Sequence, residues 1–202
     1  MIHIYFDMDG VLAKYERNAY MEDPETHERL FETKNKHYFR YVAADDKMTN
    51  VLFHLTDEIH TQKSGINIRT HVISTLSKKS SAFIEQYDDK VAWLNENIKN
   101  FPAKEFYPAL GEKRDIAVLI RGKKLNTTDI LIDDYNVNLT SWRNAGGTAI
   151  KYINGVNSAE SWDGPYIDQA MTSAEIIRML EILARTNSAL SLIHISEPTR
   201  PY

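Results

Sequence analysis

Short β-branched and aromatic runs alternate with helical stretches along most of this 202-residue chain. The runs are typical of strands and lie at residues 2–6, 69–73, 105–110, 129–132 and 148–153. Helices are predicted at residues 79–100 (two helices broken near Asp88 and Asp89), 114–121 and 137–145, and after a capping box at Thr172 and Glu175. This alternation predicts an α/β fold, with a Rossmann-like parallel sheet covered by helices on both faces.

One segment interrupts the alternation. Residues 7–68 separate the first expected strand from the second, which is too long for a simple crossover. Within them Met48, Leu52 and Leu55 keep helical spacing, and either Asp45 or Asp46 is suited to cap that helix. We therefore predict a core domain of residues 1–14 and 69–189, with a small helical cap, residues 15–68, inserted after the first strand.

The last residues of the chain, 190–202, differ in character from the rest. Their sequence resembles the translation of a widely used transposase sequencing adapter joined to a truncated reading frame. We expect them to be a non-native tail and leave them out of the fold prediction. The alternative is a genuine short strand followed by a polar tail.

Composition narrows the classes of function. The chain has 24 Lys and Arg against 28 Asp and Glu, without a basic block, so we expect no duplex nucleic acid as partner. It has no cysteine, which excludes disulfides, thiolate zinc sites and a cysteine nucleophile. The longest apolar run covers only residues 116–120, and the N-terminus has no signal-peptide pattern. We expect a cytoplasmic protein without membrane contact, and its oligomeric state stays open.

Acidic and hydroxyl residues follow three of the expected strands. The first strand leads into Asp7 and Asp9, the second ends in the hydroxyl pair at residues 74–75, and the fourth ends in Asp133 and Asp134. Ligands of an open parallel sheet bind beyond the carboxyl ends of its strands, so we expect these side chains to meet. Clustered carboxylates repel unless a cation lies among them, and oxygen ligands suit Mg²⁺. The sequence therefore predicts a magnesium site.

Two of these segments also carry a family resemblance. FDMDGVL at residues 6–12 and ILIDD at residues 130–134 resemble the first and fourth motifs of the haloacid dehalogenase-like superfamily of aspartate-nucleophile phosphatases. The resemblance implies that Asp7 attacks a phosphate monoester and that Asp9 acts as general acid and base. It further implies that Thr75 binds the phosphoryl oxygens.

The same resemblance implies a set of metal ligands and a lysine. Mg²⁺ would be held by Asp7, by the backbone carbonyl of Asp9 and by Asp133 or Asp134. The lysine of the superfamily lies near the start of a helix before the fourth motif, and Lys113 follows the third expected strand and opens a helix. Its rivals have simpler interpretations: Lys123 and Lys124 are expected in a solvated loop, and Lys90 as an ordinary exposed helix residue.

Beyond these motifs the chain resembles the 5′(3′)-deoxyribonucleotidases, or C-type 5′-nucleotidases, and in particular their bacterial and phage-like members. The shared segments are residues 7–15, 73–79, 90–94, 132–135 and 142–151. The resemblance implies that Tyr15 stacks on a nucleobase and that Ser77 and Lys79 lie near the substrate phosphate or sugar. It predicts a Mg²⁺-dependent phosphatase for nucleoside monophosphates, with deoxyribonucleotides as substrates. The alternatives are a phosphatase for another small phosphate ester or a nucleic-acid end, and a non-catalytic nucleotide-binding protein of the same fold.

Two aromatic segments keep alternative interpretations. Tyr38, Phe39 and Tyr41 either line a base pocket or form the core of the cap. Residues 162–166 are predicted to form a surface turn.

Overall fold

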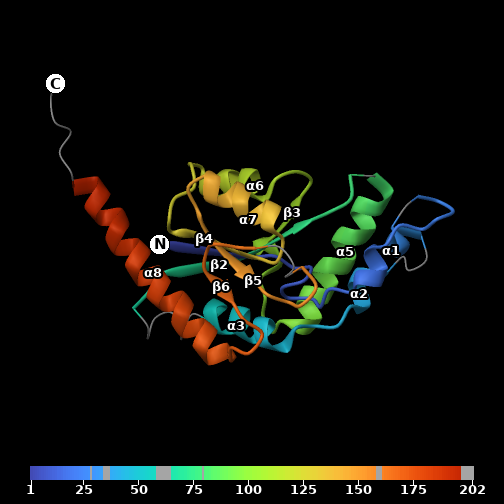
Figure 1. Cartoon of the computed structure of the whole chain (residues 1–202), viewed down its shortest axis with the longest axis horizontal. Coiled ribbons are helices and arrows are strands. Elements are labelled where there is room, and N and C mark those ends of the chain that lie inside the picture. The colour runs from blue at the N-terminus through green and yellow to red at the C-terminus, as the bar shows by residue number, and fades with distance from the viewer. Residues whose placement is uncertain (28, 34–36, 58–64, 79, 158–160, 197–202) are drawn as a thin grey trace, which may run out of the picture.

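The computed structural model of the chain describes residues 1–27, 29–33, 37–57, 65–78, 80–157 and 161–196. In this part of the chain a 6-stranded sheet has the order β3-β2-β1-β4-β5-β6 (Figure 1). All of its strand pairs are parallel. The strands are β1 (Ile2–Phe6), β2 (Ile68–Thr75), β3 (Phe106–Ala109), β4 (Asp129–Asp133), β5 (Thr148–Tyr152) and β6 (Tyr166–Ile167).

Helices cover both faces of the sheet, as the sequence predicted (Figure 1). One face packs against α6 (Lys113–Arg121) and α7 (Asn136–Asn144), and the other against α3 (Asp46–Thr56), α5 (Ser80–Asn97) and α8 (Ser173–Ser196). Side chains of β1 alternate between the two layers, with Ile4 and Phe6 in the larger core and Tyr5 in the smaller one. The α/β class with a Rossmann-like parallel sheet is confirmed.

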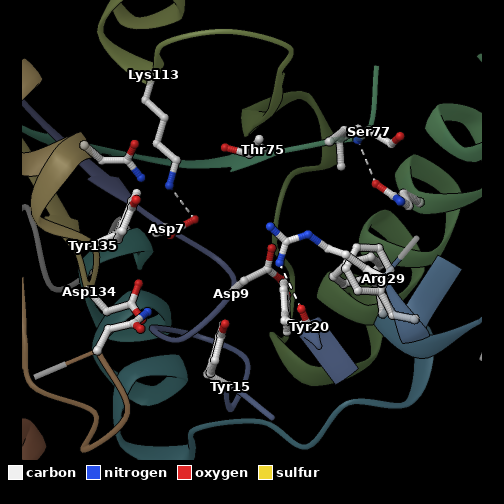
Figure 2. A pocket seen from close by; sticks show the side chains of 16 residues that line it. Asp7, Asp9, Tyr15, Tyr20, Arg29, Thr75, Ser77, Lys113, Asp134 and Tyr135 are labelled. Carbon is white, nitrogen blue, oxygen red and sulfur yellow. Dashed lines mark hydrogen bonds and ion pairs between the residues drawn. The ribbon is translucent and has the colours of Figure 1, made fainter. Parts of the chain in front are cut away.

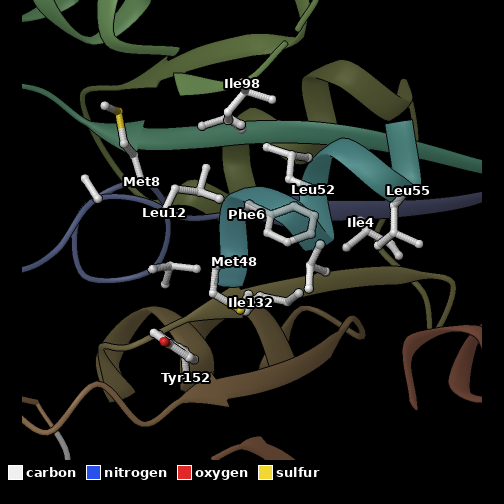
Figure 3. Close-up of a cluster of buried hydrophobic side chains, with 14 of the residues drawn as sticks. Ile4, Phe6, Met8, Leu12, Met48, Leu52, Leu55, Ile98, Ile132 and Tyr152 are labelled. Carbon is white, nitrogen blue, oxygen red and sulfur yellow. The ribbon is translucent and has the colours of Figure 1, made fainter. Parts of the chain in front are cut away.

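The larger core holds the loop after β1 in place (Figure 3). Met8 and Leu12 of this loop are fully buried and belong to the same cluster as Phe6 and Leu52. Burying a side chain of this size stabilises the fold by about 1.5–3 kcal/mol. The loop that carries Asp9 is therefore anchored by its apolar residues and leaves its polar ones free to face a site.

Helix α3, which the sequence analysis placed in the cap, packs on the sheet. Asp45 is its N-cap, and the Asp45 side chain accepts hydrogen bonds from the backbone N–H groups of Lys47 and Met48, both at 3.1 Å. Met48 and Leu52 are fully buried in the larger core. Among the described residues of the expected cap, the short elements that remain are η1 (Arg17–Tyr20), α1 (Leu30–Thr33) and α2 (Tyr38–Tyr41). The boundaries of the cap domain stay a prediction.

One prediction of local structure is wrong, and a second is wrong only at its last residue. Helix α5 runs without a break through Asp88 and Asp89, because Asp89 is buried and its carboxylate contacts Nδ1 of His37 at 3.2 Å. The expected turn at residues 162–166 leads directly into β6, where Tyr166 pairs with Lys151 of β5. A strand of two residues is too short for a hydrophobic period to reveal it.

The C-terminal helix continues into the segment expected to be a tail. Helix α8 begins after the predicted capping box, in which Thr172 and Glu175 exchange hydrogen bonds. Its backbone is helical to Ser196, which contradicts the short-strand alternative, and residues 197–202 lie outside the described residues. The adapter origin of the tail stays a prediction.

None of the described helices combines the length and apolar character that crossing a membrane requires.

A chain of polar side chains crosses the face of the sheet that α6 covers. Arg121 of α6 donates to Nε2 of His3 in β1, and Nδ1 of His3 lies 2.9 Å from Nε2 of His71 in β2. Nδ1 of His71 in turn lies 2.7 Å from Oε2 of Glu105. Because the guanidinium can only donate, each imidazole must accept at Nε2 and carry its proton on Nδ1. Burial lowers the pKa of His3 to about 3, with Arg121 assisting, and lowers that of His71 to about 4, so both rings are neutral near pH 7.

Candidate active site

The carboxyl ends of the central strands open into a cavity of about 470 Å³ (Figure 2). The chain builds β2 and β3 on one side of β1 and β4 to β6 on the other, so the strand order reverses beside β1. Such a reversal point leaves a crevice in open parallel sheets. The cavity is lined by Asp7, Asp9, Tyr15, Tyr20, Arg29, Phe31, Phe39, Thr75, Leu76, Ser77, Gln86, Lys113, Asp134, Tyr135, Asn138 and Asn157.

Three carboxylates from two adjacent strands converge at the base of this cavity. Asp7 directly follows β1, Asp133 ends β4 and Asp134 follows it, and one ligand oxygen of each lies within 4.8 Å of the others. All three residues are buried. Burial, together with the neighbouring carboxylates, raises the pKa of Asp7 well above its usual range, and burial and Asp133 raise that of Asp134 to about 7. A divalent cation would relieve this repulsion, and an all-oxygen donor set fits Mg²⁺.

Lys113 is the cation that the fold supplies to this cluster. It is the first residue of α6, and its Nζ lies 2.7 Å from Oδ1 of Asp7 and 2.7 Å from Oδ2 of Asp133. Burial alone would lower the pKa of Lys113, but Asp133 and Asp7 raise it, so the ammonium keeps its charge. Lys123 and Lys124 are exposed beyond the end of α6. The structure thus brings together Asp7 and the lysine that the sequence analysis preferred.

Gly10 lets the loop after β1 pass close to the cluster. Its φ of +84° is a left-handed conformation, and a Cβ built there would lie 2.3 Å from Oδ2 of Asp134. The loop is held from the other side by Asn154, which donates to the backbone carbonyl of Gly10 at 3.0 Å. Only glycine fits this conformation and this space. This gives a physical reason for the glycine directly after Asp9 in the motif.

The Asp9 side chain points to a different cation. It is not part of the carboxylate group formed by the described residues Asp7, Asp133 and Asp134, and its Oδ2 contacts Nζ of Lys90. The expectation that Lys90 is exposed is wrong, because its side chain is 0% exposed. Helix α5 turns this residue toward the end of β2, where Nζ also donates to Oγ of Ser74 at 2.8 Å.

The remaining predicted residues line other walls of the cavity (Figure 2). Thr75 is the last residue of β2, and Ser77 follows in a loop whose backbone N–H donates to Oε1 of Gln86 at 2.9 Å. Tyr15 lies opposite, with its ring stacked on Tyr20 at a centroid distance of 4.5 Å. Lys79 lies outside the described residues. The chemical roles of these residues stay predictions.

The aromatic segment in the cap is divided between the core, the cavity and the surface, and its role as a base pocket stays a prediction. Tyr38 and Phe39 are buried in the larger core, and Phe39 also lines the cavity. Tyr41 is 79% exposed and belongs to neither. Arg29, exposed at the entrance, donates to the backbone carbonyl of Tyr20 at 3.1 Å. The aromatic side chains on this wall make it suited to a flat ring.

Sequence reasoning missed three asparagines that support the carboxylates. Asn154 and Asn157 donate to Oδ2 of Asp134 at 2.6 and 2.7 Å, and Asn138 donates to Oδ2 of Asp133 at 3.0 Å. Asn154 closely follows β5, so the rule applied to the first, second and fourth strands would have found it if extended to the fifth. Asn157 and Asn138 give no such signal, because they lie in a loop and inside a helix.

Solved structures with the same fold are hydrolases. The D,D-heptose 1,7-bisphosphate phosphatase from B. bronchiseptica, solved with magnesium and phosphate, superposes with a TM-score of 0.55 at 13% identity, over 89% of this chain and 98% of that one. A HAD family hydrolase from Deinococcus radiodurans R1, with bound phosphate and sodium, gives 0.53 at 13% identity, over 91% and 96%. A hydrolase from Pseudomonas syringae gives 0.53 at 13% identity, over 90% and 99%. The chain has the haloacid dehalogenase-like fold. No protein-family profile and no curated protein matches the sequence.

Proposed function

We propose that the protein is a Mg²⁺-dependent phosphatase that hydrolyses nucleoside monophosphates, with deoxyribonucleotides as its preferred substrates. One observation carries the proposal: Asp7 lies within reach of both the Asp133–Asp134 pair and the Lys113 ammonium, at the crevice of the sheet. A carboxylate flanked by a cation site and an ammonium is suited to attack a phosphate dianion, since both positive charges offset the repulsion. The proposal places the enzyme in the cytoplasm, with a small nucleotide as its partner.

The reaction takes two steps. In the first, a carboxylate oxygen of Asp7 bonds to phosphorus, the bond from phosphorus to the substrate oxygen breaks, and Asp9 gives its proton to the departing alkoxide. In the second, water attacks the aspartyl-phosphate and passes a proton to Asp9, which releases inorganic phosphate and restores Asp7. Lys113 neutralises the phosphoryl oxygens, and the Thr75 hydroxyl donates to them.

The metal ligands in this proposal are Asp7, the backbone carbonyl of Asp9, and Asp133 or Asp134. When bound, Mg²⁺ would stabilise the negative charge that gathers on the phosphoryl group. The three supporting asparagines hold the carboxylates of Asp133 and Asp134 in place, which fits a role as oriented ligands.

The aromatic wall supports a nucleotide rather than a simple sugar phosphate. Tyr15, Tyr20, Phe31 and Phe39 line the same cavity as Asp7. Stacking of a base on an aromatic ring contributes about 1–3 kcal/mol to binding. We infer that the base lies on this wall while its phosphate reaches Asp7, and that Tyr15 supplies part of the stacking.

The direct test is phosphate release in the presence of Mg²⁺ from a panel of substrates. The panel contains deoxy- and ribonucleoside 5′- and 3′-monophosphates, hexose phosphates and a 5′-phosphorylated oligonucleotide. We expect turnover of the deoxyribonucleotides, and its complete loss in Asp7→Asn. Cleavage of hexose phosphates without any nucleotide would refute the substrate and keep the chemistry. Nucleotides that raise the melting temperature, with no activity that Asp7→Asn removes, would favour the non-catalytic alternative.

The base-stacking role has its own test. Replacing Tyr15 by alanine should raise KM for nucleotides about tenfold, equivalent to about 1.4 kcal/mol, and leave KM for 2-deoxyribose 5-phosphate, which has no aromatic ring, unchanged. Tyr41→Ala is the matched control, because Tyr41 is 79% exposed and lies outside the cavity lining. An equal effect of Tyr15→Ala on both substrates would contradict stacking on the base.

A further inference from the structure

Lys90 is a buried cation outside the carboxylate cluster. Its side chain is fully buried in α5, and its Nζ contacts Oδ2 of Asp9, donates to Oγ of Ser74 at 2.8 Å and lies 4.1 Å from the ring centre of Phe39. Burying an ammonium costs free energy unless it is paired and hydrogen-bonded. Here three different segments supply its partners: the loop after β1, the end of β2 and the cap.

The site therefore contains two separate lysines with separate partners. Lys113 contacts Asp7 and Asp133, whereas Lys90 contacts Asp9. The Asp9 side chain remains 19% exposed and lines the cavity, so one of its oxygens is held while the carboxyl group still reaches the substrate space. The Asp9 carboxylate contacts Lys90 and, at 3.4 Å, Oγ of Ser74, and these contacts hold it on the β2 side of the cavity.

We propose that Lys90 is a positioning residue for Asp9, which keeps the Asp9 carboxyl group away from the metal ligands and directed at the oxygen of the leaving group. This inference rests on the proposed function, in which Asp9 exchanges the proton. Ser74 fixes the ammonium from the strand side, and Phe39 covers it from the cap side and excludes water. Lys90 is not among the described residues that line the cavity, so its effect on the substrate passes through the orientation of Asp9.

The test compares two substrates that differ in their need for a proton. Departure of the nucleoside alkoxide from 2′-deoxythymidine 5′-monophosphate needs protonation, whereas p-nitrophenolate leaves without it. In Lys90→Met, kcat for the nucleotide should fall about 10²-fold and kcat for p-nitrophenyl phosphate less than about fivefold, with KM nearly unchanged. Asp9→Asn should show the same split, and the double variant should be no slower than Asp9→Asn. Lys99→Met, an exposed lysine just after α5, is the matched control.

Equal losses on both substrates, or losses that add in the double variant, would overturn the positioning role. Methionine fills the space of the lysine stem, and Asp9 keeps access to solvent, so we expect the variant to fold. Ser74→Ala provides a second variant, which removes one contact of Nζ and keeps the lysine. It should show a smaller loss with the same preference for the nucleotide, and an equal loss on both substrates would count against the proposal.

A crystal structure of Lys90→Met separates this inference from the proposed function. The Asp9 carboxylate should leave its position beside Ser74 in that variant. An unmoved Asp9 would refute the positioning role, whatever the enzyme cleaves. A wild-type protein that cleaves neither substrate would refute the proposed function, and a displaced Asp9 in the variant would still support the control of its orientation by Lys90.

Discussion

Two buried histidines are expected to make the stability of the fold depend on pH. The pKa of His3 is lowered to about 3 and that of His71 to about 4, from an ordinary value of 6.5. Because the unfolded chain binds these protons at a higher pH than the folded chain, the contribution to stability is complete above pH 6.5. It is lost as the pH falls toward the folded values. Arg121 and Arg69 face the pair as cations, and the carboxylate of Glu105 does not offset burial.

The size of the effect follows from the shifts. At pH 5 protonation stabilises each unfolded imidazole by about 2 kcal/mol and each folded one by less than about 0.1 kcal/mol. The pair therefore destabilises the fold by up to about 4 kcal/mol, a large share of the roughly 5–15 kcal/mol of a typical domain. Asp7 and Asp134 have the opposite effect on stability as the pH falls. Their pKa values are raised in the folded chain, so the folded chain binds these protons at a higher pH than the unfolded chain does. The contribution of the histidines must therefore be measured as the difference between the wild type and a histidine variant in how the free energy of unfolding changes with pH.

The assay is urea unfolding at pH 7 and pH 5 at equal ionic strength. His71→Gln keeps a donor and an acceptor for its neighbours but cannot be protonated. Between pH 7 and pH 5 this variant should lose about 2 kcal/mol less stability than the wild type loses. A variant with both His3 and His71 replaced should lose up to about 4 kcal/mol less than the wild type. His27→Gln is the control, since the His27 side chain is 79% exposed. The reasoning is refuted if His71→Gln keeps the pH dependence of the wild type.

Three further predictions concern the cavity. Lys113→Met leaves buried carboxylates without their ammonium, so it should lower the free energy of unfolding by about 3 kcal/mol and remove activity, as measured by denaturation and phosphate release. Adding Mg²⁺ at 100 times its Kd should stabilise the wild type by about 2.7 kcal/mol. Replacing Asp133 and Asp134 together by asparagine should remove the Mg²⁺-induced thermal shift, whereas the exposed-site control Asp163→Asn should keep it; a shift that persists in the double variant would contradict the ligand assignment. Gly10→Ala, whose Cβ would lie 2.3 Å from Oδ2 of Asp134, should cost at least about 1 kcal/mol and weaken the Mg²⁺ shift; an unchanged melting temperature would argue against the close approach.

The strand ends show why much of the candidate site could be predicted. In a parallel sheet the chain direction alone decides which edge a residue reaches, so the acidic residues after β1 and β4 had to meet once the strands were identified. The meeting of these carboxylates needed only local pattern and the direction of the chain. Lys113 was chosen on the superfamily resemblance, which implies a lysine near the start of a helix before the fourth motif, and it is the first residue of α6.

Other features depend on which surface a helix packs against, and the sequence pattern did not reveal this. Lys90 directly follows Asp88 and Asp89 in α5 and has the pattern of an exposed lysine, yet the packing of α5 beside β2 buries it against Asp9. The spacing of Met48 and Leu52 predicted a helix correctly but not its place on the sheet. A helical period tells which residues share a face, and it does not tell which surface that face meets.

By itself the amino-acid sequence determined five of the six strands that the structure describes, most helices and the edge of the sheet where acidic residues gather, since these follow from hydrophobic period and chain direction. Tertiary structure alone decided how charges are divided within the cavity, with one lysine on the Asp7 cluster and another on Asp9. It also decided the histidine pair across β1 and β2, which forms because two neighbouring strands place residues 68 positions apart in direct contact. Contacts of this kind arise from packing between distant segments, and no local pattern encodes them.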